Sequence, residues 1–246
     1  MAYPFPHINI KVYPKTFLKD VHIGLFFPEA ILSEELQERA TKFFEKKFGL
    51  PNIKMEEMPN ATSVFSNDNK IRFSFGLSRV DLSIKREVYR SFADTSPLLQ
   101  ILFDYLKVTN SELIEKIVFS KYNELVYEAK EDTPVAEVME GVFSGDLLES
   151  MSQRDRETQK DLSRWEKIVR ATGDDATDSI FTIEYGFSKK QEGASDNSLT
   201  LKTLIESRIP QILSTDIPEV LKEYNQVLDN AFHWCVSDQV LNAMKQ

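Results

Sequence analysis

The 246-residue chain has little of the residue types that carry most enzyme chemistry. It contains three histidines, His7, His22 and His233, together with one cysteine and eight glycines. The histidines are scattered singly, so no spacing suits a metal ion or a nucleophile with its base. No glycine-rich phosphate loop, paired-cysteine site or nucleophile elbow is present. We therefore expect no catalytic residues, no cofactor and no metal site.

Cysteine and long apolar runs are also scarce, and this bears on location. The single Cys235 cannot form an intramolecular disulfide, which is typical of proteins from the reducing cytoplasm. No run of about 18 apolar residues is present, so we expect no membrane-spanning helix. The N-terminal residues contain early prolines and no apolar signal region. The sequence therefore predicts a soluble, cytoplasmic protein with no membrane partner.

The composition indicates a folded protein with a negative net charge. Hydrophobic residues make up 41% of the chain, and 17 phenylalanines supply bulky side chains for a core. Lys and Arg total 30 against 39 Asp and Glu, which gives a net charge of −9. Nucleic-acid binding draws much of its affinity from cations that neutralise phosphates. We therefore expect no nucleic-acid partner.

Apolar residues follow helical spacing in some segments and strand spacing in others. Recurrence every three or four positions predicts helices over about 33–48, 97–107 and 218–236. Alternation of apolar and polar residues predicts strands at 21–27, 62–66, 70–77, 80–84, 88–92, 113–120, 124–129, 181–187 and 199–209. Strands with one apolar and one polar face belong to antiparallel sheets. The sequence thus predicts an α+β fold, an antiparallel sheet with helices packed on one face.

The composition changes at residues 130–145, which combine acidic residues with a proline and two glycines. We take this segment as the boundary between two related α+β halves, residues 1–135 and 136–246. The first half should hold a strand, a helix, antiparallel strands, a second helix and further strands. The second should hold a charged helix over Ser152–Arg170, a strand pair and the long C-terminal amphipathic helix.

Two segments of the second half could contact a partner. Trp and Arg are enriched at the centres of protein interfaces, and both occur in the charged segment. The C-terminal helix has a continuous apolar seam, which could mediate dimerisation. A solvated surface helix and packing on the protein's own sheet are the respective alternatives. The candidate interface residues, for a protein partner or a homo-oligomer, are Arg154, Arg156, Arg164, Trp165, Tyr224 and Trp234.

Two other functions remain open. A metal-assisted hydrolase would need at least two carboxylates of the predicted strands to converge, and the candidates are Asp81, Glu115, Glu128 and Glu184. Alternatively, the phenylalanine-rich core could enclose an aromatic-lined cavity for a small ligand between sheet and helices. Such a cavity should exceed roughly 300 Å³.

The order of several sequence segments along the chain is similar to that in a known family. The segments VHIGLFFP at 21–28, VDLSIKREVYRSF at 80–92 and VLDNAFHWCVSDQVL at 227–241 occur in order, and Lys121-Tyr122-Asn123 stands in place of an arginine-tyrosine-asparagine signature. In this the chain resembles a sporadically distributed prokaryotic family of uncharacterised α+β proteins of similar length. The resemblance implies a cytoplasmic α+β protein and a mobile or defence-related gene neighbourhood, but no reaction. Because the chain combines a well-built hydrophobic scaffold with no catalytic constellation, we expect a non-enzymatic protein-binding or assembly protein.

Overall fold

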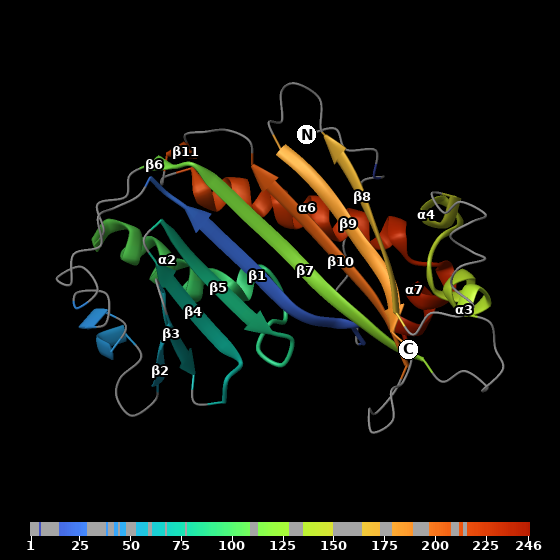
Figure 1. Ribbon diagram of the computed structural model, residues 1–246, viewed down its shortest axis with the longest axis horizontal. Coiled ribbons are helices and arrows are strands. Elements are labelled where there is room, and N and C mark those ends of the chain that lie inside the picture. Colours follow the sequence, from blue (N-terminus) through green and yellow to red (C-terminus); the bar gives the residue numbers. More distant parts are fainter. Residues whose placement is uncertain are drawn as a thin grey trace.

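The fold is an antiparallel sheet with helices on one face (Figure 1). The computed structural model describes residues 5, 15–28, 38, 42–43, 45–47, 53–58, 61–66, 68–76, 78–108, 113–127, 135–149, 164–172, 179–188, 197–207, 212–213 and 216–246. In these ranges the sheet has nine strands in the order β2-β3-β4-β5-β1-β7-β10-β9-β8. Every neighbouring pair is antiparallel. The predicted α+β class and antiparallel sheet are confirmed.

The described strands of the large sheet are β1 (Leu18–Phe26), β2 (Ile53–Met58), β3 (Ala61–Ser66), β4 (Ile71–Gly76), β5 (Arg79–Lys85), β7 (Lys116–Tyr127), β8 (Arg164–Thr172), β9 (Ser179–Ser188) and β10 (Asn197–Ser207). A separate pair is formed by β6 (Leu113–Ile114) and β11 (Ile212–Leu213). The described helices are η1 (Ala93–Thr95), α2 (Ser96–Val108), α3 (Val135–Val142), α4 (Gly145–Glu149), α6 (Ile217–Cys235) and α7 (Asp238–Met244). None of the helices in the described ranges is long and apolar enough to cross a membrane.

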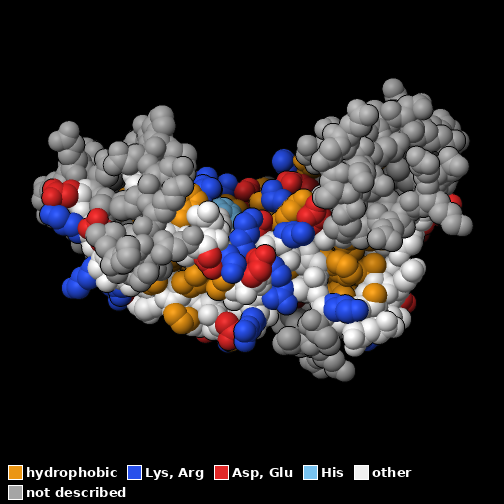
Figure 2. All heavy atoms as spheres, turned by 90° about the horizontal axis from the view of Figure 1, so that it is seen from below, with side chains coloured by type: hydrophobic (Ala, Val, Ile, Leu, Met, Phe, Trp, Pro, Cys, Tyr) orange, Lys and Arg blue, Asp and Glu red, His pale blue; other side chains and the backbone are white. Residues whose placement is uncertain are grey.

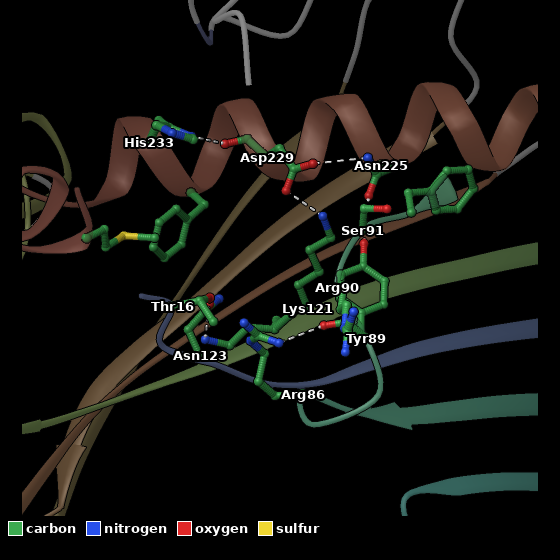
Figure 3. A pocket seen from close by; sticks show the side chains of 14 residues that line it. Thr16, Arg86, Tyr89, Arg90, Ser91, Lys121, Asn123, Asn225, Asp229 and His233 are labelled. Carbon is green, nitrogen blue, oxygen red and sulfur yellow. Dashed lines mark hydrogen bonds and ion pairs between the residues drawn. The ribbon is translucent and has the colours of Figure 1, made fainter. Parts of the chain in front are cut away.

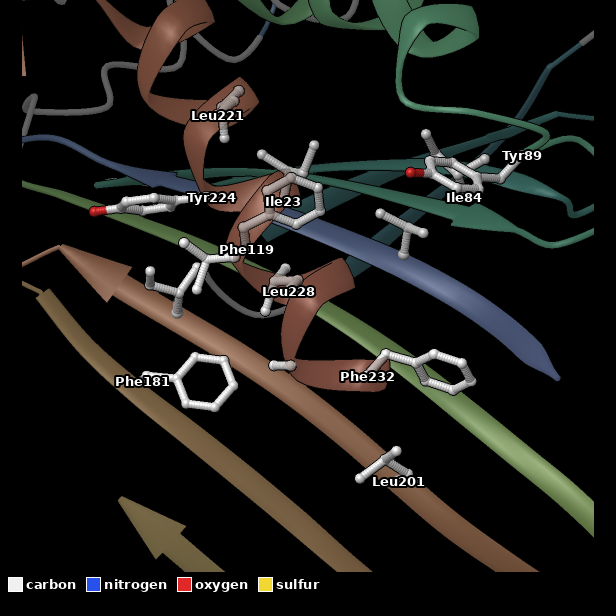
Figure 4. Packing of buried hydrophobic residues seen from close by; sticks show 14 of the residues in the cluster. Ile23, Ile84, Tyr89, Phe119, Phe181, Leu201, Leu221, Tyr224, Leu228 and Phe232 are labelled. Carbon is white, nitrogen blue, oxygen red and sulfur yellow. The ribbon is translucent and has the colours of Figure 1, made fainter. Parts of the chain in front are cut away.

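The core lies between the sheet and α6. Val21, Ile23 and Leu25 alternate along β1 and are fully buried, because successive side chains of a strand point to opposite faces. The seam of α6 packs over β7 and β10, with Leu221, Tyr224 and Leu228 facing the strands (Figure 4). Each large apolar side chain buried in this way contributes on the order of 1.5–3 kcal/mol. The alternative reading of the seam, packing on the protein's own sheet, is therefore what the structure shows.

Several predicted elements agree with the structure. The strands expected at 21–27, 62–66, 80–84 and 181–187 correspond to β1, β3, β5 and β9, and the helices expected at 97–107 and 218–236 correspond to α2 and α6. Of the helix expected over Ser33–Phe48, residues 38, 42–43 and 45–47 are helical and the remaining positions lie outside the described residues. The boundary segment 130–145 holds α3 and the start of α4 in its described part.

Three predictions are wrong, namely a strand at 88–92, a break between the strands at 113–120 and 124–129, and a helix at 164–170. The strand expected at 88–92 is a loop, because the backbone N–H groups of Val88 and Tyr89 both bond to the carbonyl of Lys85 in a turn. The strands expected at 113–120 and 124–129 are largely one continuous strand, β7. The charged helix is wrong for residues 164–170, which belong to β8 and pair with β9 along their length, and residues 152–163 of the expected helix lie outside the described residues. Charged residues are compatible with this strand because it lies at the end of the strand order in the described sheet.

The two expected halves share a single sheet. Strand β7 of residues 1–135 pairs with β10 of residues 136–246 over ten residue pairs. The long helix α6 packs on both of these strands. The two segments therefore meet at the β7–β10 pair, inside the sheet, where α6 covers both strands.

Candidate functional site

The predicted interface residues do not gather in one place. Arg154 and Arg156 lie outside the described residues, and Arg164 and Trp165 are on β8. Tyr224 is 3% exposed in the core, so its side chain is not available to a partner in this structure. Trp234 is half-buried, and its ring lies 5.5 Å from that of Phe5.

The strand carboxylates do not converge where they are described. Asp81 on β5 and Glu184 on β9 are separated by β1, β7 and β10, which places them roughly 19 Å apart at the usual strand spacing. Glu184 bonds to Lys202 at 3.1 Å, and Asp81 bonds to the Nε2 of His22 at 2.8 Å. Glu115 is exposed beside β7, and Glu128 lies outside the described residues. In the described part of the chain, no group of three metal-ligating side chains is present.

A pocket of about 480 Å³ lies between the sheet and α6 (Figure 3). Its walls come from the start of β1, the loop after β5, the middle of β7, α6 and the end of α7. The volume is within the range of small-molecule sites and above the minimum that the cavity hypothesis requires. Aromatic side chains line part of it, namely Tyr89, Phe92 and Phe232. The pocket fits the cavity hypothesis in volume and position, although polar and charged side chains make up most of its described lining, and ligand binding stays a prediction.

Strand β7 places two polar side chains on the core face at this pocket. Its core-facing positions run through Ile117 and Phe119 to Lys121, Asn123 and Leu125. The Asn123 amide donates to the carbonyl of Leu201 at 3.3 Å. Lys121 rises toward α6, and its ammonium donates to a carboxylate oxygen of Asp229. The Lys121 side chain is only 7% exposed, so a cation is held inside the fold.

Lys121 has spare hydrogen-bonding capacity. An ammonium carries three N–H donors, and Asp229 is its single acceptor among the described residues. The ring of Tyr89 lies 5.8 Å from Nζ and adds a cation–π contact but no oxygen acceptor. Buried donors without acceptors are costly, so water or a bound group must complete this site from the pocket side.

Helix α6 turns a row of polar side chains toward the pocket. Asn225, Asp229 and His233 are four residues apart and therefore lie on one face of the helix (Figure 3). The Asn225 amide donates to Asp229 at 3.0 Å and accepts from the Tyr89 hydroxyl at 3.3 Å. The Nδ1 of His233 lies 2.7 Å from the Asp229 carbonyl. Of these contacts, the bond from Asn225 reaches the Asp229 carboxylate and holds it in position beside Lys121.

The loop after β5 supplies further cations. The Arg86 guanidinium donates to the carbonyl of Tyr89 at 3.0 Å, which holds it against the loop. Arg90 is exposed and has no hydrogen-bond or ion-pair partner in the described part of the structure. Burial, with a smaller effect of Asp229 and Asp94, raises the pKa of Tyr89, so its hydroxyl remains a donor at neutral pH.

The described lining of the pocket therefore carries three cations, Arg86, Arg90 and Lys121, against the single carboxylate of Asp229. This excess is opposite in sign to the net charge of −9 of the whole chain. In the view from below, by contrast, acidic and basic side chains are interleaved across the middle of the molecule (Figure 2). A locally positive concave site favours anionic ligands.

Sequence reasoning missed these residues, although two signals were present. Lys121 and Asn123 interrupt the apolar alternation of β7, at the gap between the strands expected at 113–120 and 124–129. Asn225, Asp229 and His233 form a polar row beside the apolar seam of α6, and such a row is also found on ordinary solvated helices. The spacing of His233 from the other histidines suits neither a metal ion nor a nucleophile with its base, and it gives no sign of this pocket. The loop residues Arg86 and Arg90 carry no sequence signal of their own.

Comparisons with known proteins place no constraint on function. No protein-family model and no curated protein matches the chain, so the resemblance found in the sequence stays a prediction. A solved structure described as Methanococcus jannaschii TBP is 14% identical with a TM-score of 0.27, covering 88% of this chain and 98% of that one. An aspartate kinase of Clostridium acetobutylicum is 11% identical with a TM-score of 0.22, covering 92% of this chain and 36% of that one. TM-scores of this size do not show a common fold.

Proposed function

We propose that the protein is a binding protein for a small organic anion, which it holds in the pocket between β7 and α6. The observation that carries the proposal is Lys121, a buried ammonium with unused donors facing the cavity. A site of this kind gains binding energy when an anion supplies acceptors to the ammonium. Arg86 and Arg90 add to the attraction from the loop side.

The geometry favours ligand binding over the other functions expected from the sequence. The hydrolase hypothesis requires converging carboxylates, and Asp81 and Glu184 lie on separate strands of the sheet. Self-association or binding of a protein partner stays a prediction, because Arg154 and Arg156 lie outside the described residues. We keep the cytoplasm as the expected location, since the single cysteine cannot form an intramolecular disulfide.

A pair of fluorescent probes tests the proposal. The aromatic sulfonate 8-anilinonaphthalene-1-sulfonate carries one negative charge, whereas N-phenyl-1-naphthylamine has the same ring system without the charge. We expect saturable binding of the sulfonate, weakened by about tenfold or more in Arg90→Gln, because a charge-assisted contact is removed. Binding of the neutral amine should change little in that variant.

The matched control is Arg170→Gln, which removes an exposed arginine from β8 and leaves the pocket untouched. A second pocket variant, Lys121→Met combined with Asp229→Leu, removes both buried charges together and should also weaken sulfonate binding. Equal loss of sulfonate binding in Arg90→Gln and Arg170→Gln, or no loss in either pocket variant, would show that the dye binds elsewhere. The proposal would then be wrong.

A further inference from the structure

The pocket has two chemically different ends, and the segment at the start of β1 spans them. The N–H of Lys15 bonds to the carbonyl of Met244 at 3.3 Å, at the end of α7. Four residues later, the carbonyl of Lys19 accepts from the N–H of Arg86 at 2.9 Å, in the loop after β5. Thr16 and Leu18, which line the pocket, therefore lie between a Met244 end and an Arg86 end.

Helix α6 runs between the same two ends. Asn225 contacts the Tyr89 hydroxyl near Arg86, while Phe232 and His233 lie two turns further along the helix. Residues 225 and 233 are roughly 12 Å apart along a helix axis. Asp229 and its partner Lys121 lie between them (Figure 3). The pocket is thus elongated along α6, with Lys121 near its middle.

The Met244 end holds most of the apolar lining, namely Leu18, Phe232 and Met244, with the polar Asn123 and His233 beside them. Phe232 and Met244 are buried, and Leu18 is half-buried beside Asn123, its partner in the strand register. The Arg86 end carries Arg86 and Arg90, and the polar Ser91 lies next to them in the loop. A ligand that satisfies both ends must have an anionic head and an apolar body.

We propose, resting on the anion-binding function above, that the pocket takes an amphipathic organic acid. Its carboxylate would lie toward Arg86, Arg90 and Lys121, and its alkyl or aryl body would extend toward Leu18, Phe232 and Met244. An extended chain advances about 1.25 Å per carbon, so a chain of roughly ten carbons matches the distance between the two ends. This polarity distinguishes an amphipathic acid from small hydrophilic anions.

Displacement of the bound anilinonaphthalene sulfonate by acetate, hexanoate and decanoate tests this inference. We expect the inhibition constant to fall by about tenfold or more from hexanoate to decanoate, because each added methylene is buried at the apolar end. Met244→Gln should reduce this chain-length dependence and leave the response to acetate unchanged. Arg90→Gln should weaken inhibition by all three acids while the chain-length dependence persists.

Leu18→Gln serves as a second variant of the apolar end, so that a folding defect in one variant does not decide the outcome; circular dichroism checks both. Equal inhibition by the three acids would overturn the inference. So would a chain-length dependence that is unchanged in both Met244→Gln and Leu18→Gln. If Arg90→Gln still weakens sulfonate binding, either of these results leaves the anion-binding function in place. If Arg90→Gln binds the sulfonate as well as the unchanged protein does, the anion-binding function itself is refuted.

Discussion

Lys121 is the residue on which the pocket depends, because a cation inside a fold requires a matched environment. Its ammonium pairs with Asp229, and Asn225 and Tyr89 extend the contact into a short polar network. Such networks stabilise a fold when every member is satisfied and destabilise it when one member is removed. The unused donors of Lys121 make the network incomplete without a pocket occupant.

Replacement of Asp229 by asparagine separates stability from binding. Asp229→Asn leaves a buried ammonium without its counter-charge, so we expect the free energy of unfolding to fall by about 1–3 kcal/mol. The figure is below that of a fully buried pair because the Asp229 side chain is 22% exposed. The same change should strengthen sulfonate binding, since the competing carboxylate is gone. Urea unfolding and fluorescence titration measure the two effects.

The control for this variant is Glu219→Gln on the same helix. Glu219 forms an exposed pair with Lys222 at 3.5 Å, and exposed pairs contribute less than about 1 kcal/mol. Comparable destabilisation by both changes would contradict a special role for the Lys121–Asp229 pair. An unchanged or weaker affinity for the sulfonate in Asp229→Asn would contradict competition for Lys121.

Cys235 should be inert in the folded protein. Its side chain is fully buried at the end of α6, and burial raises the pKa of the thiol above its ordinary value. The reactive thiolate is therefore scarce at pH 8. We expect almost no reaction with a disulfide reagent such as Ellman's reagent at pH 8 in buffer, and one equivalent of reaction in denaturant. Rapid labelling of the native protein would contradict this burial.

At the scale of elements, α7 closes the apolar end of the pocket because it carries Met244. Ser237 caps this helix, its hydroxyl accepting from the N–H of Val240 at 3.4 Å. The same hydroxyl donates to the carbonyl of Gly141 at 2.7 Å and so ties α7 to α3. The Ser237 side chain, which lies outside the pocket, therefore helps to hold this wall in place.

Removing this cap should therefore affect both stability and binding. We expect Ser237→Ala to lower the free energy of unfolding by about 1–2 kcal/mol. Decanoate should also bind less well, since the Met244 end is less ordered. Gln239→Ala, at an exposed position of the same helix, should change neither quantity. If the two alanine variants cannot be distinguished by chemical denaturation, the hydroxyl does not stabilise α7.

Strand β7 shows how much of this element could be predicted. Its apolar alternation predicts strand structure at both ends, and the structure confirms strand there. The break predicted near Lys121 is wrong, because polar residues on a core face resemble a loop in sequence. The opposite error occurs over Val88–Phe92, where a strand is predicted and a loop is found. Val88, Tyr89 and Phe92 suggest a strand, but local hydrogen bonds turn the chain toward α2.

At the scale of the whole molecule, β1, β7 and β10 form the middle of the fold. Each pairs with a neighbour on both sides, and α6 packs over β7 and β10. In the described sheet, β2 and β8 stand at the two ends of the strand order. Opening of the central strands therefore requires loss of most of the core, whereas the end strands can open locally.

Hydrogen exchange measured by mass spectrometry should reflect this arrangement. We expect amide protection in peptides from β7 and β10 to exceed that in β2 and β8 by about tenfold or more. Saturating decanoate should slow exchange further in α7 and in the loop at residues 86–92, at the two ends of the pocket. Uniform protection across the sheet would contradict the central position of β7, and an unchanged loop would contradict ligand contact there.

The sequence by itself determined the fold class, most strands of the sheet and the two long helices, because hydrophobic periodicity is local and survives without tertiary information. Only the tertiary structure decided which polar residues meet. Thr16, Arg86, Lys121, Asp229 and Met244 come from five separate segments, and their proximity depends on strand order, loop path and the position of α6. Local patterns specify which face of an element is apolar, but not which other element will lie opposite it. For that reason the pocket, unlike the sheet, could not be predicted from the sequence.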